Sequence, residues 1–363
     1  MTLVEVAQNV RITKLQQLLT RTLESKASDL HLVVGHPPCL RINTVLHPIE
    51  GEETLTQACL EEMVLEMLGE DRFATFLKNR EADFSTAVAG LGRFRVNAHF
   101  QQDVIGIAFR AIPAKTPVLD QLNLPPVVQS FADLPRGLLL VTGDTGSGKS
   151  TTLAAIIDHI NQTRRQHIIT LEDPIEYRIQ SKQCLVEQRE IGSDSHSFSA
   201  ALRTVVRQDP DVILVGEMRD LETVAAAVTA AETGHYVLST LHTIDASGTI
   251  ERIIDFFPPQ QQNQIRGQLA NTLRGVVSQT LFPRIDKPGM VPAVEVLVMT
   301  PAVRNCIRED RLFEIPNVIT TNRSLGMQSL DSSIRDLYMN GFISRESALA
   351  QASNPDRLAK TLQ

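Results

Sequence analysis

The segment that most constrains the fold of this chain is an apolar run that ends in a glycine-rich loop, GLLLVTGDTGSGKS at residues 137–150. Residues 137–143 form a continuous apolar run, which is typical of a strand buried on both faces of a parallel sheet. The loop has the spacing Gly143-x-x-x-x-Gly148-Lys149-Ser150, and a helix is expected at 149–163. This order predicts a phosphate-binding loop, because glycines let backbone N–H groups face an anion at the start of a helix.

The loop also predicts how a nucleoside triphosphate is held. Lys149 is expected to reach the β- and γ-phosphates, and the Ser150 hydroxyl to join the coordination shell of Mg²⁺. The alternative is a glycine turn with an incidental lysine. Asp144 is an unexpected acid in a loop that holds anions. We expect its backbone to face the phosphates and its side chain to point away, toward solvent or an arginine.

The residues after the loop alternate between short apolar runs and helical patterns. Short connections between such segments predict a mostly parallel sheet with helices on both faces, an α/β fold. The part at 258–363 is expected to be mainly helical. The expected strands are 167–173, 211–217, 236–243 and 291–299, and the expected helices are 198–208 and 221–234.

The first third of the chain has a different pattern, which predicts a small α+β domain at 1–112. A proline-punctuated linker at 113–126 and a second domain at 127–363 are expected to follow. Within the first domain the strands after residue 83 are expected to break at Gly90–Gly92 and at Asp103. The other expected elements there are helices at 12–27 and 60–69 and strands at 29–35, 39–49 and 83–112.

Composition excludes several classes of protein. The net charge of −7, the absence of Trp and an aromatic content of 4% argue against a nucleic-acid partner. The four cysteines lie far apart without a C-x-x-C pair, so we expect reduced thiols in a cytoplasmic protein. We find neither an apolar run of ~20 residues nor the apolar core of a signal peptide, so no direct membrane insertion is expected.

Acidic residues follow two of the predicted strands. DVILVGE ends in Glu217, which would emerge beside the glycine loop and orient the metal's water shell or the attacking water. TLEDPIEY at 170–177 places Glu172, Asp173 and Glu176 on a proline-containing turn. Such a cluster is either a solvated acidic loop or a set of groups that positions metal and water, with one carboxylate as general base.

Histidines and arginines give two further candidates. His235 and His242 lie at the two ends of an expected strand, and His242, at its carboxyl end, is the better candidate for sensing the γ-phosphate. Arg93 and Arg95 in GRFRVNAHF lie two residues apart, on one face of a strand. They form either an exposed charged face or cationic groups that reach the nucleotide of a neighbouring subunit.

The order of phosphate loop, acidic turn, GEMRD (216–220) and histidine segment resembles the hexameric secretion-type ATPases of type II secretion and type IV pili. SDLHL (28–32) and GRFRVNAHF resemble the family's PAS-like N-terminal domain, and GVVSQTLFPRI (275–285) its C-terminal helical region. AVRNCIRED and GMQSLDSSIRDLY resemble the pilus-retraction members. The four-cysteine insertion and additional N-terminal domains of the extension and secretion members are not found in this sequence.

The resemblance implies a RecA-like P-loop ATPase domain behind a PAS-like domain. It also implies a homohexamer that uses ATP and Mg²⁺ to drive pilus retraction. Expected partners are an inner-membrane platform protein and a paralogous retraction ATPase, with the protein peripheral at that membrane. The alternatives are a low-turnover accessory ATPase and an extension or secretion ATPase. Cys306, in place of the family's usual Leu, is expected to pack as a small apolar residue.

Site roles follow from the same resemblance. It implies Glu176 as general base, Glu217 as the acid at the metal, His242 as sensor, and Arg93 and Arg95 acting on a neighbour's nucleotide. The residues expected to bind nucleotide are Thr145, Gly146, Ser147, Gly148, Lys149, Ser150, Thr151 and Glu172, with Ser150 and Glu217 at the metal.

Overall fold

A computed structural model describes residues 13–42, 45–88, 92–112 and 116–362 of the chain. The chain divides into two compact units, Met1–Lys115 and Thr116–Gln363. The expected strand break at Gly90 and the first residues of the expected linker, 113–115, lie outside the described residues. The remainder of that linker contains a short 3-10 helix, Leu119–Gln121, and leads into the helix α3, Pro126–Ala132.

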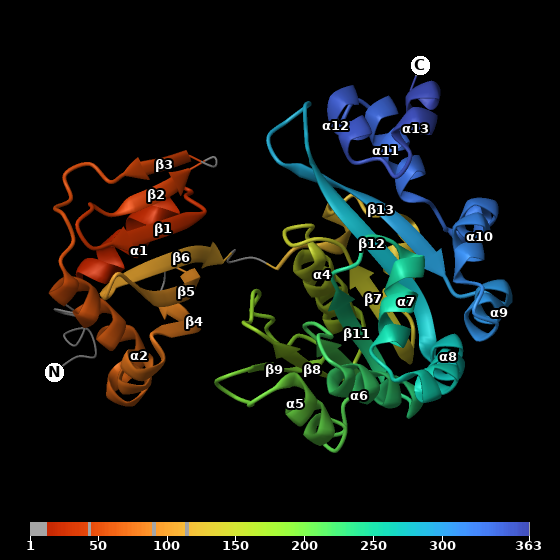
Figure 1. Cartoon of the computed structure of the whole chain (residues 1–363), viewed down its shortest axis with the longest axis horizontal. Coiled ribbons are helices and arrows are strands. Elements are labelled where there is room, and N and C mark those ends of the chain that lie inside the picture. The colour runs from red at the N-terminus through yellow and green to blue at the C-terminus, as the bar shows by residue number, and fades with distance from the viewer. Residues whose placement is uncertain (1–12, 43–44, 89–91, 113–115, 363) are drawn as a thin grey trace. The chain divides into compact units, whose positions relative to one another are not determined.

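The N-terminal unit is an antiparallel sheet with strand order β3-β2-β1-β6-β5-β4, and two helices pack on it (Figure 1). The strands after residue 80 form a meander in which β5 pairs with both β4 and β6. This confirms the α+β expectation for the first third. The elements are α1 Lys14–Glu24, β1 Asp29–Val33, β2 Cys39–Ile42, β3 Val45–Pro48, α2 Gln57–Asn79, β4 Glu81–Val88, β5 Gly92–Gln101 and β6 Val104–Ile112.

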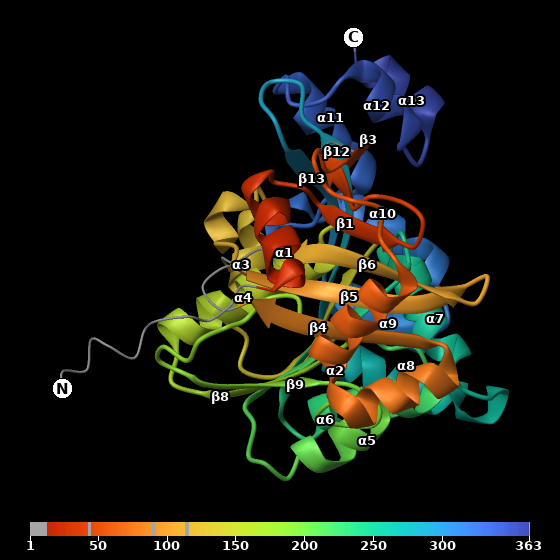
Figure 2. The same cartoon turned by 90° about the vertical axis from the view of Figure 1, so that its left-hand side faces the viewer.

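Alternation along the central strands separates the two faces of this sheet. Phe94 and Val96 of β5 are buried in one cluster with Leu18 of α1 and Leu60 of α2, so both helices cover the same face (Figure 2). Arg95, between the two buried residues, is exposed on the other face. Period-two alternation therefore places the odd-numbered polar residues of β5 away from the core.

The C-terminal unit contains a mixed sheet with strand order β13-β12-β7-β11-β10-β8-β9. Strands β12 to β9 in this order run parallel, and β13 pairs antiparallel with β12. The expectation of a mostly parallel sheet is confirmed. The strands are β7 Gly137–Thr142, β8 His167–Glu172, β9 Leu185–Glu190, β10 Val212–Val215, β11 Tyr236–Leu241, β12 Leu273–Pro283 and β13 Met290–Val298.

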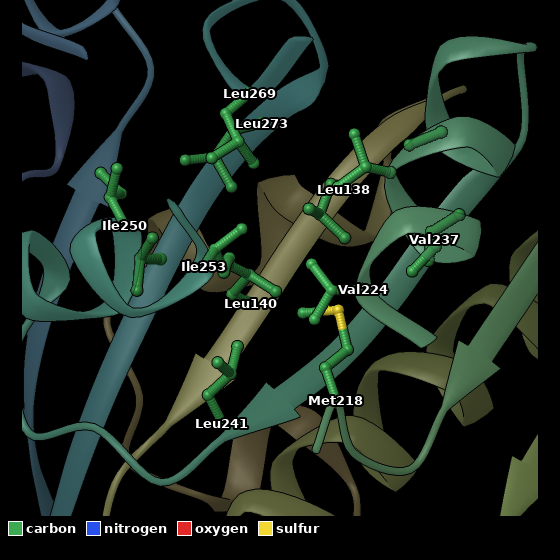
Figure 3. Packing of buried hydrophobic residues seen from close by; sticks show 14 of the residues in the cluster. Leu138, Leu140, Met218, Val224, Val237, Leu241, Ile250, Ile253, Leu269 and Leu273 are labelled. Carbon is green, nitrogen blue, oxygen red and sulfur yellow. The ribbon is translucent and has the colours of Figure 1, made fainter. Parts of the chain in front are cut away.

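The continuous apolar run of β7 is explained by two hydrophobic clusters, one on each face of the sheet. Leu138 and Leu140 pack with residues of α6, α7 and α8, as Figure 3 shows. Leu139 and Val141 point the other way, into a cluster with α3 and α4. The helices are α3 Pro126–Ala132, α4 Lys149–Thr163, α5 Phe198–Val205, α6 Leu221–Glu232, α7 Ala246–Asp255, α8 Pro259–Thr272, α9 Pro301–Arg308, α10 Ile315–Thr321, α11 Leu330–Met339, α12 Arg345–Ala350 and α13 Pro355–Thr361.

The expectation for residues 258–363 is wrong in one respect. Residues 275–285 were expected in a helical region, but 273–283 form β12, which pairs with β7 on one side and β13 on the other. The partner β7 is distant in sequence, and the partner β13 is reached only after the chain reverses its direction. A local sequence pattern therefore does not indicate either pairing. β-Branched residues such as Val276 and Val277 favour the strand once these partners are present. Strand β9 was also not expected.

Strand β12 brings a buried glutamine to the loop that follows β7. The side chain of Gln279 donates from Nε2 to the carbonyl oxygen of Ser147 at 2.6 Å, and its Oε1 accepts from the Thr152 hydroxyl at 3.0 Å. Both contacts are buried. The neighbouring Ser278 hydroxyl accepts from Thr142, the last residue of β7, at 2.8 Å. Three adjacent elements are therefore joined by buried hydrogen bonds around the glycine loop.

Strand β13 carries a largely buried carboxyl group. Glu295 accepts from the backbone N–H of Ala246, the first residue of α7, at 2.9 Å. Burial raises the pKa of Glu295 to about 7, and the nearby carboxylates of Asp245 and Asp331 act in the same direction. The N–H of Ala246 opposes this shift of the pKa. At neutral pH the protein therefore holds a carboxyl group that is partly protonated.

Replacing Gln279 by Leu should destabilise the C-terminal unit. The substitution leaves the Ser147 carbonyl and the Thr152 hydroxyl buried without their partner, at a cost of about 2–4 kcal/mol. Differential scanning calorimetry of the full chain measures the fall in melting temperature. Gln260→Leu, at an exposed position of α8, is the control. Equal melting temperatures for the two variants would contradict the structural role of Gln279.

Glu295 should make stability depend on pH. Its folded-state pKa of about 7 lies above the ordinary value of 4.5, so the folded protein binds the proton more tightly than the unfolded chain. The contribution of Glu295 to the free energy of unfolding should therefore fall as pH rises from about 4.5 through about 7 and level off above that pH. Glu295→Gln keeps an acceptor for Ala246 without the charge. It should gain roughly 1–3 kcal/mol over the wild type at pH 8 and little at pH 4.5.

Melting curves recorded from pH 4.5 to pH 8 measure this difference. Glu251→Gln, which removes an exposed carboxylate from α7, the helix that Glu295 contacts through Ala246, is the matched control and should follow the wild type. A Glu295→Gln variant that shows the same pH dependence as the wild type would mean that this carboxyl group does not titrate in the expected range.

Candidate active site

The glycine loop lies between β7 and α4, as the sequence predicts. Gly143 has φ 136° and approaches β12 so closely that a Cβ there would lie 2.2 Å from the carbonyl oxygen of Gln279. Gly148, at φ 87°, is the N-cap of α4 and supplies no side chain to cap it. The first N–H groups of α4 thus lack a side-chain acceptor. A helix start of this kind favours an anion.

Lys149 lies buried against the loop. Its Nζ donates to the carbonyl oxygens of Gly143 at 2.7 Å and Asp144 at 2.8 Å. Burial lowers the pKa of Lys149, and the negative charges of Asp144 and Glu176 oppose this. Asp144 itself is exposed, while its carbonyl turns to the lysine. The acid therefore adds negative charge near Lys149 without occupying the interior of the loop.

The hydroxyl of Ser147 is a buried polar atom without a hydrogen-bond partner. An unpaired buried hydroxyl costs free energy, so it indicates a partner that the protein alone does not provide. With the glycine backbone, the α4 N-terminus and Lys149, it forms a donor set that fits a phosphate group. Thr145, Gly146 and Ser150 are exposed beside it. The Thr151 hydroxyl instead lies 3.0 Å from the hydroxyl of Tyr177.

A pocket next to the loop collects the acids that the sequence identified. Ser150, Glu172, Glu176 and Glu217 all line it, together with Asp173. They come from the start of α4, the end of β8 and the turn that follows it, and the loop after β10. The carboxyl ends of neighbouring parallel strands meet at one edge of a sheet, and this brings them together.

Glu172 is held by two side chains within this pocket. Its Oε1 accepts from the Thr170 hydroxyl at 2.6 Å and from Gln188 Nε2 at 3.0 Å. Burial raises the pKa of Glu172, while these two donors lower it. Because Glu172 is enclosed and hydrogen-bonded, the alternative of a solvated acidic loop does not describe it. Gln188 belongs to β9, which was not expected from the sequence.

Glu217 and His242 lie close to one another, with 3.6 Å between Glu217 Oε2 and His242 Nε2. Burial lowers the pKa of His242, and the charges of Lys149 and Arg219 act in the same direction. The imidazole is therefore neutral at neutral pH. His235, at the other end of β11, hydrogen-bonds through Nδ1 to the carbonyl oxygen of Ala230 at 2.9 Å, which fits the structural role expected for it.

Arg93 and Arg95 belong to the N-terminal unit, on β5. Arg93 Nη2 donates to the Ser85 hydroxyl at 2.6 Å, and Arg95 lines a shallow pocket of this sheet with Asp29 and Asp83. Both lie on the sheet face away from the helices, as the spacing predicts. Their action on a nucleotide stays a prediction.

Sequence reasoning missed several contacts of the site. Gln279 and Gln188 were missed because their strands were not expected, and neither has a local motif. Arg219 stands two residues after Glu217 in the GEMRD segment, and this short spacing of opposite charges is the signal from which the pair is predictable. Its guanidinium donates to both oxygens of Glu217.

Among the described residues no cluster of three or more His, Cys, Asp or Glu could hold a metal ion. Mg²⁺ commonly keeps several waters and binds through few protein groups plus the phosphates of a substrate. The pocket with Ser150 and Glu217 fits that mode. Within the same residues, no helix is both long and apolar enough to cross a membrane.

Comparisons with known proteins agree on one family. Residues 120–306 match the family of type II/IV secretion system proteins. The type IV pilus retraction ATPase PilT of Pseudomonas aeruginosa is 46% identical over 94% of this chain and 98% of its own length. The type IV pilus ATPase PilU of the same organism is 39% identical over 94% of this chain and 90% of its own length.

A solved structure agrees with these relatives. The crystal structure of the pilus retraction motor PilT with bound ADP superposes with a TM-score of 0.89 at 42% identity, covering 95% of this chain and 98% of that one. The match covers nearly all of this chain and therefore extends over both units described above. The chain therefore belongs to the type II/IV secretion system protein family and, within it, to the PilT group of ATPases.

Proposed function

We propose that this chain hydrolyses ATP and that the energy drives retraction of type IV pili. The observation that carries the proposal is the single pocket in which Ser150, at the glycine loop, meets Glu172, Glu176 and Glu217. These are the groups that phosphoryl transfer to water requires: a phosphate-binding loop, a metal-binding hydroxyl and carboxylates that orient water. The name of the 46% identical relative supports retraction as the work performed.

Phosphate binding is assigned to the loop 145–151. Lys149 would exchange its carbonyl acceptors, Gly143 and Asp144, for phosphate oxygens, which offer full negative charge. The unpaired hydroxyl of Ser147 gains an acceptor in the same step. The groups that hold the phosphates are Thr145, Gly146, Ser147, Gly148, Lys149, Ser150 and Thr151.

The metal site is assigned to Ser150 and Glu217. Mg²⁺, when bound with ATP, neutralises charge on the phosphates and fixes their orientation. The Ser150 hydroxyl would coordinate it directly, and Glu217 would act through the metal's water shell. Both side chains line the same pocket, which supports the assignment.

Water activation is assigned to Glu176, with Glu172 contributing to nucleotide binding. The two carboxyl groups differ in their surroundings. Glu172 is fixed by Thr170 and Gln188, whereas Glu176 lines the pocket from the turn that follows. A general base must have an oxygen free to reach the attacking water, which suits Glu176 better than Glu172, whose Oε1 already accepts two hydrogen bonds. His242, beside Glu217, would sense the γ-phosphate.

Oligomeric assembly is part of the proposal. Arg93 and Arg95 would stabilise charge on the nucleotide of a neighbouring copy, so the active form would contain more than one copy. The resemblance to the hexameric secretion-type ATPases makes a homohexamer the form that we propose. Its partners would be an inner-membrane platform protein of the pilus and a paralogous retraction ATPase, and it would work at that membrane through the pilus machine. The 39% identity to PilU favours a second candidate, an accessory ATPase with low turnover.

Purified protein should hydrolyse ATP, and the acids should act in turnover more than in binding. Glu217→Ala and Glu176→Ala should each lower kcat by roughly 100-fold or more, because a positioned carboxylate contributes this much. A fluorescent ATP analogue should bind both variants within a few-fold of the wild type. Phosphate release measures kcat, and fluorescence titration measures the Kd.

Two variants calibrate this experiment. Lys149→Ala gives the background, and Glu251→Gln, at an exposed position of α7, should match the wild type. Wild-type turnover at the level of Lys149→Ala would contradict ATP hydrolysis and favour the accessory role. Equal losses of binding and turnover in the Glu176 variant would contradict its role as base.

Deletion of the gene should separate retraction from extension. A cell that lacks a retraction motor should keep abundant surface pili and lose twitching motility, because fibres form and cannot be withdrawn. Electron microscopy counts the pili, and spreading on a surface measures motility. Complementation with the wild-type gene is the control. Bald cells would instead assign the chain to extension or secretion.

A further inference from the structure

The loop between β10 and α6, residues 216–220, is tied at alternate positions. Gly216 donates its N–H to the carbonyl oxygen of Leu171 at 2.8 Å, and its own carbonyl oxygen accepts from the Thr240 hydroxyl at 2.6 Å. Met218 donates its N–H to the Thr240 carbonyl oxygen at 3.1 Å, and its side chain is buried in the core.

Asp220 ends the same loop as the N-cap of α6 and accepts from Thr223 N–H at 2.8 Å. The backbone is thus fixed before, between and after Glu217 and Arg219. The side chains of Glu217 and Arg219 can therefore change their orientation while the backbone of the loop stays in place.

The two side chains meet in a bidentate ion pair. Arg219 donates from Nε to one oxygen of Glu217 and from Nη2 to the other, the latter at 2.9 Å. A planar guanidinium that binds both oxygens sets the plane of the carboxylate, which a single point charge does not do. The side chain of Glu217 is 16% exposed and that of Arg219 is 62% exposed, so the arginine covers the acid from the solvent side.

The charge balance of the pocket explains why the acid needs such a partner. Glu172, Glu176 and Glu217 line one pocket. Carboxylates that lie close together repel one another, and this repulsion disfavours their charged forms. The amine of Lys149 is bonded to the carbonyl oxygens of its own loop. His242 Nε2 lies 3.6 Å from Glu217 Oε2, beyond hydrogen-bond distance, whereas Arg219 Nη2 lies 2.9 Å from the same carboxylate.

We propose that Arg219 is a positioning residue for the ATPase reaction, which holds the Glu217 carboxylate in the orientation that the metal-bound nucleotide requires. The inference rests on the proposed function. Arg219 acts through Glu217 and does not itself contact the phosphates. Its loss should therefore affect the reaction step and leave nucleotide affinity unchanged.

The test compares Arg219→Gln and Arg219→Lys with the wild type. Arg219→Gln should lower kcat roughly 10–100-fold, while KM and the Kd for a fluorescent ATP analogue stay within about 2-fold. Arg219→Lys should recover part of kcat, because it restores the charge without the bidentate geometry. Melting temperatures show that each variant is folded. Arg203→Gln removes an arginine of similar exposure, 65%, from its pair with Glu222 at 2.7 Å, and should keep kcat within about 2-fold.

A double variant tests whether Arg219 acts through Glu217. Glu217→Asp keeps a carboxylate but shortens its reach, so it should lower kcat on its own. Adding Arg219→Gln to Glu217→Asp should then change kcat by less than about 2-fold, since coupled residues are not additive.

Several results would overturn the proposal. These are an unchanged kcat in Arg219→Gln, the full single-variant loss in the Glu217→Asp background, or a weakened Kd that accounts for the loss. The Lys149→Ala background separates this inference from the proposed function. Wild-type turnover equal to that background removes both, whereas an active wild type with an equally active Arg219→Gln removes only the role of Arg219.

Discussion

The contact between the glycine loop and β12 is the constraint on which the rest of the site depends. Gly143 lies so near the β12 backbone that no side chain fits, and Gln279 fills the remaining space while bonding to Ser147 and Thr152. Close packing of this kind leaves the loop one backbone path. That path leaves the Ser147 hydroxyl buried without a partner and the start of α4 without a side-chain cap. The donors that would hold phosphate are thus prearranged by a strand more than a hundred residues later in the chain.

This dependence explains which parts of the fold were predictable. The β7 strand, the loop and α4 follow one another, so apolar run, glycine spacing and helical pattern identify them within one short segment. β12 pairs with β7, which lies far away in sequence, so no local pattern indicates this pairing. β9 pairs with the preceding strand β8, but its own residues, such as Glu187 and Gln188, do not show the alternation of a half-buried strand. The pairing partner stabilises these strands, so it is the tertiary fold that decides their structure.

The site was predictable to a similar extent. Strand ends in a parallel sheet converge, so Ser150, Glu172, Glu176 and Glu217 could be placed together from their positions alone, and the structure places them in one pocket. Their differences could not be read from sequence. Glu172 turns inward to Thr170 and Gln188, and Glu217 pairs with Arg219, because neighbouring side chains decide the orientation of each carboxylate. Identical residue types in one pocket therefore acquire distinct electrostatic surroundings.

The positive charges around the nucleotide site suggest a reason for such a motor to work as a ring. In the C-terminal unit Lys149 is the buried cation of the loop, Arg219 is paired with Glu217, and His242 is neutral at neutral pH. Charge that develops on a transferred phosphoryl group requires further positive charge. Arg93 and Arg95 stand on the polar face of the N-terminal sheet, a surface that its own helices leave uncovered. If these arginines complete the site of a neighbouring copy, hydrolysis in one copy depends on the position of the next, and such dependence couples chemistry to movement around a ring.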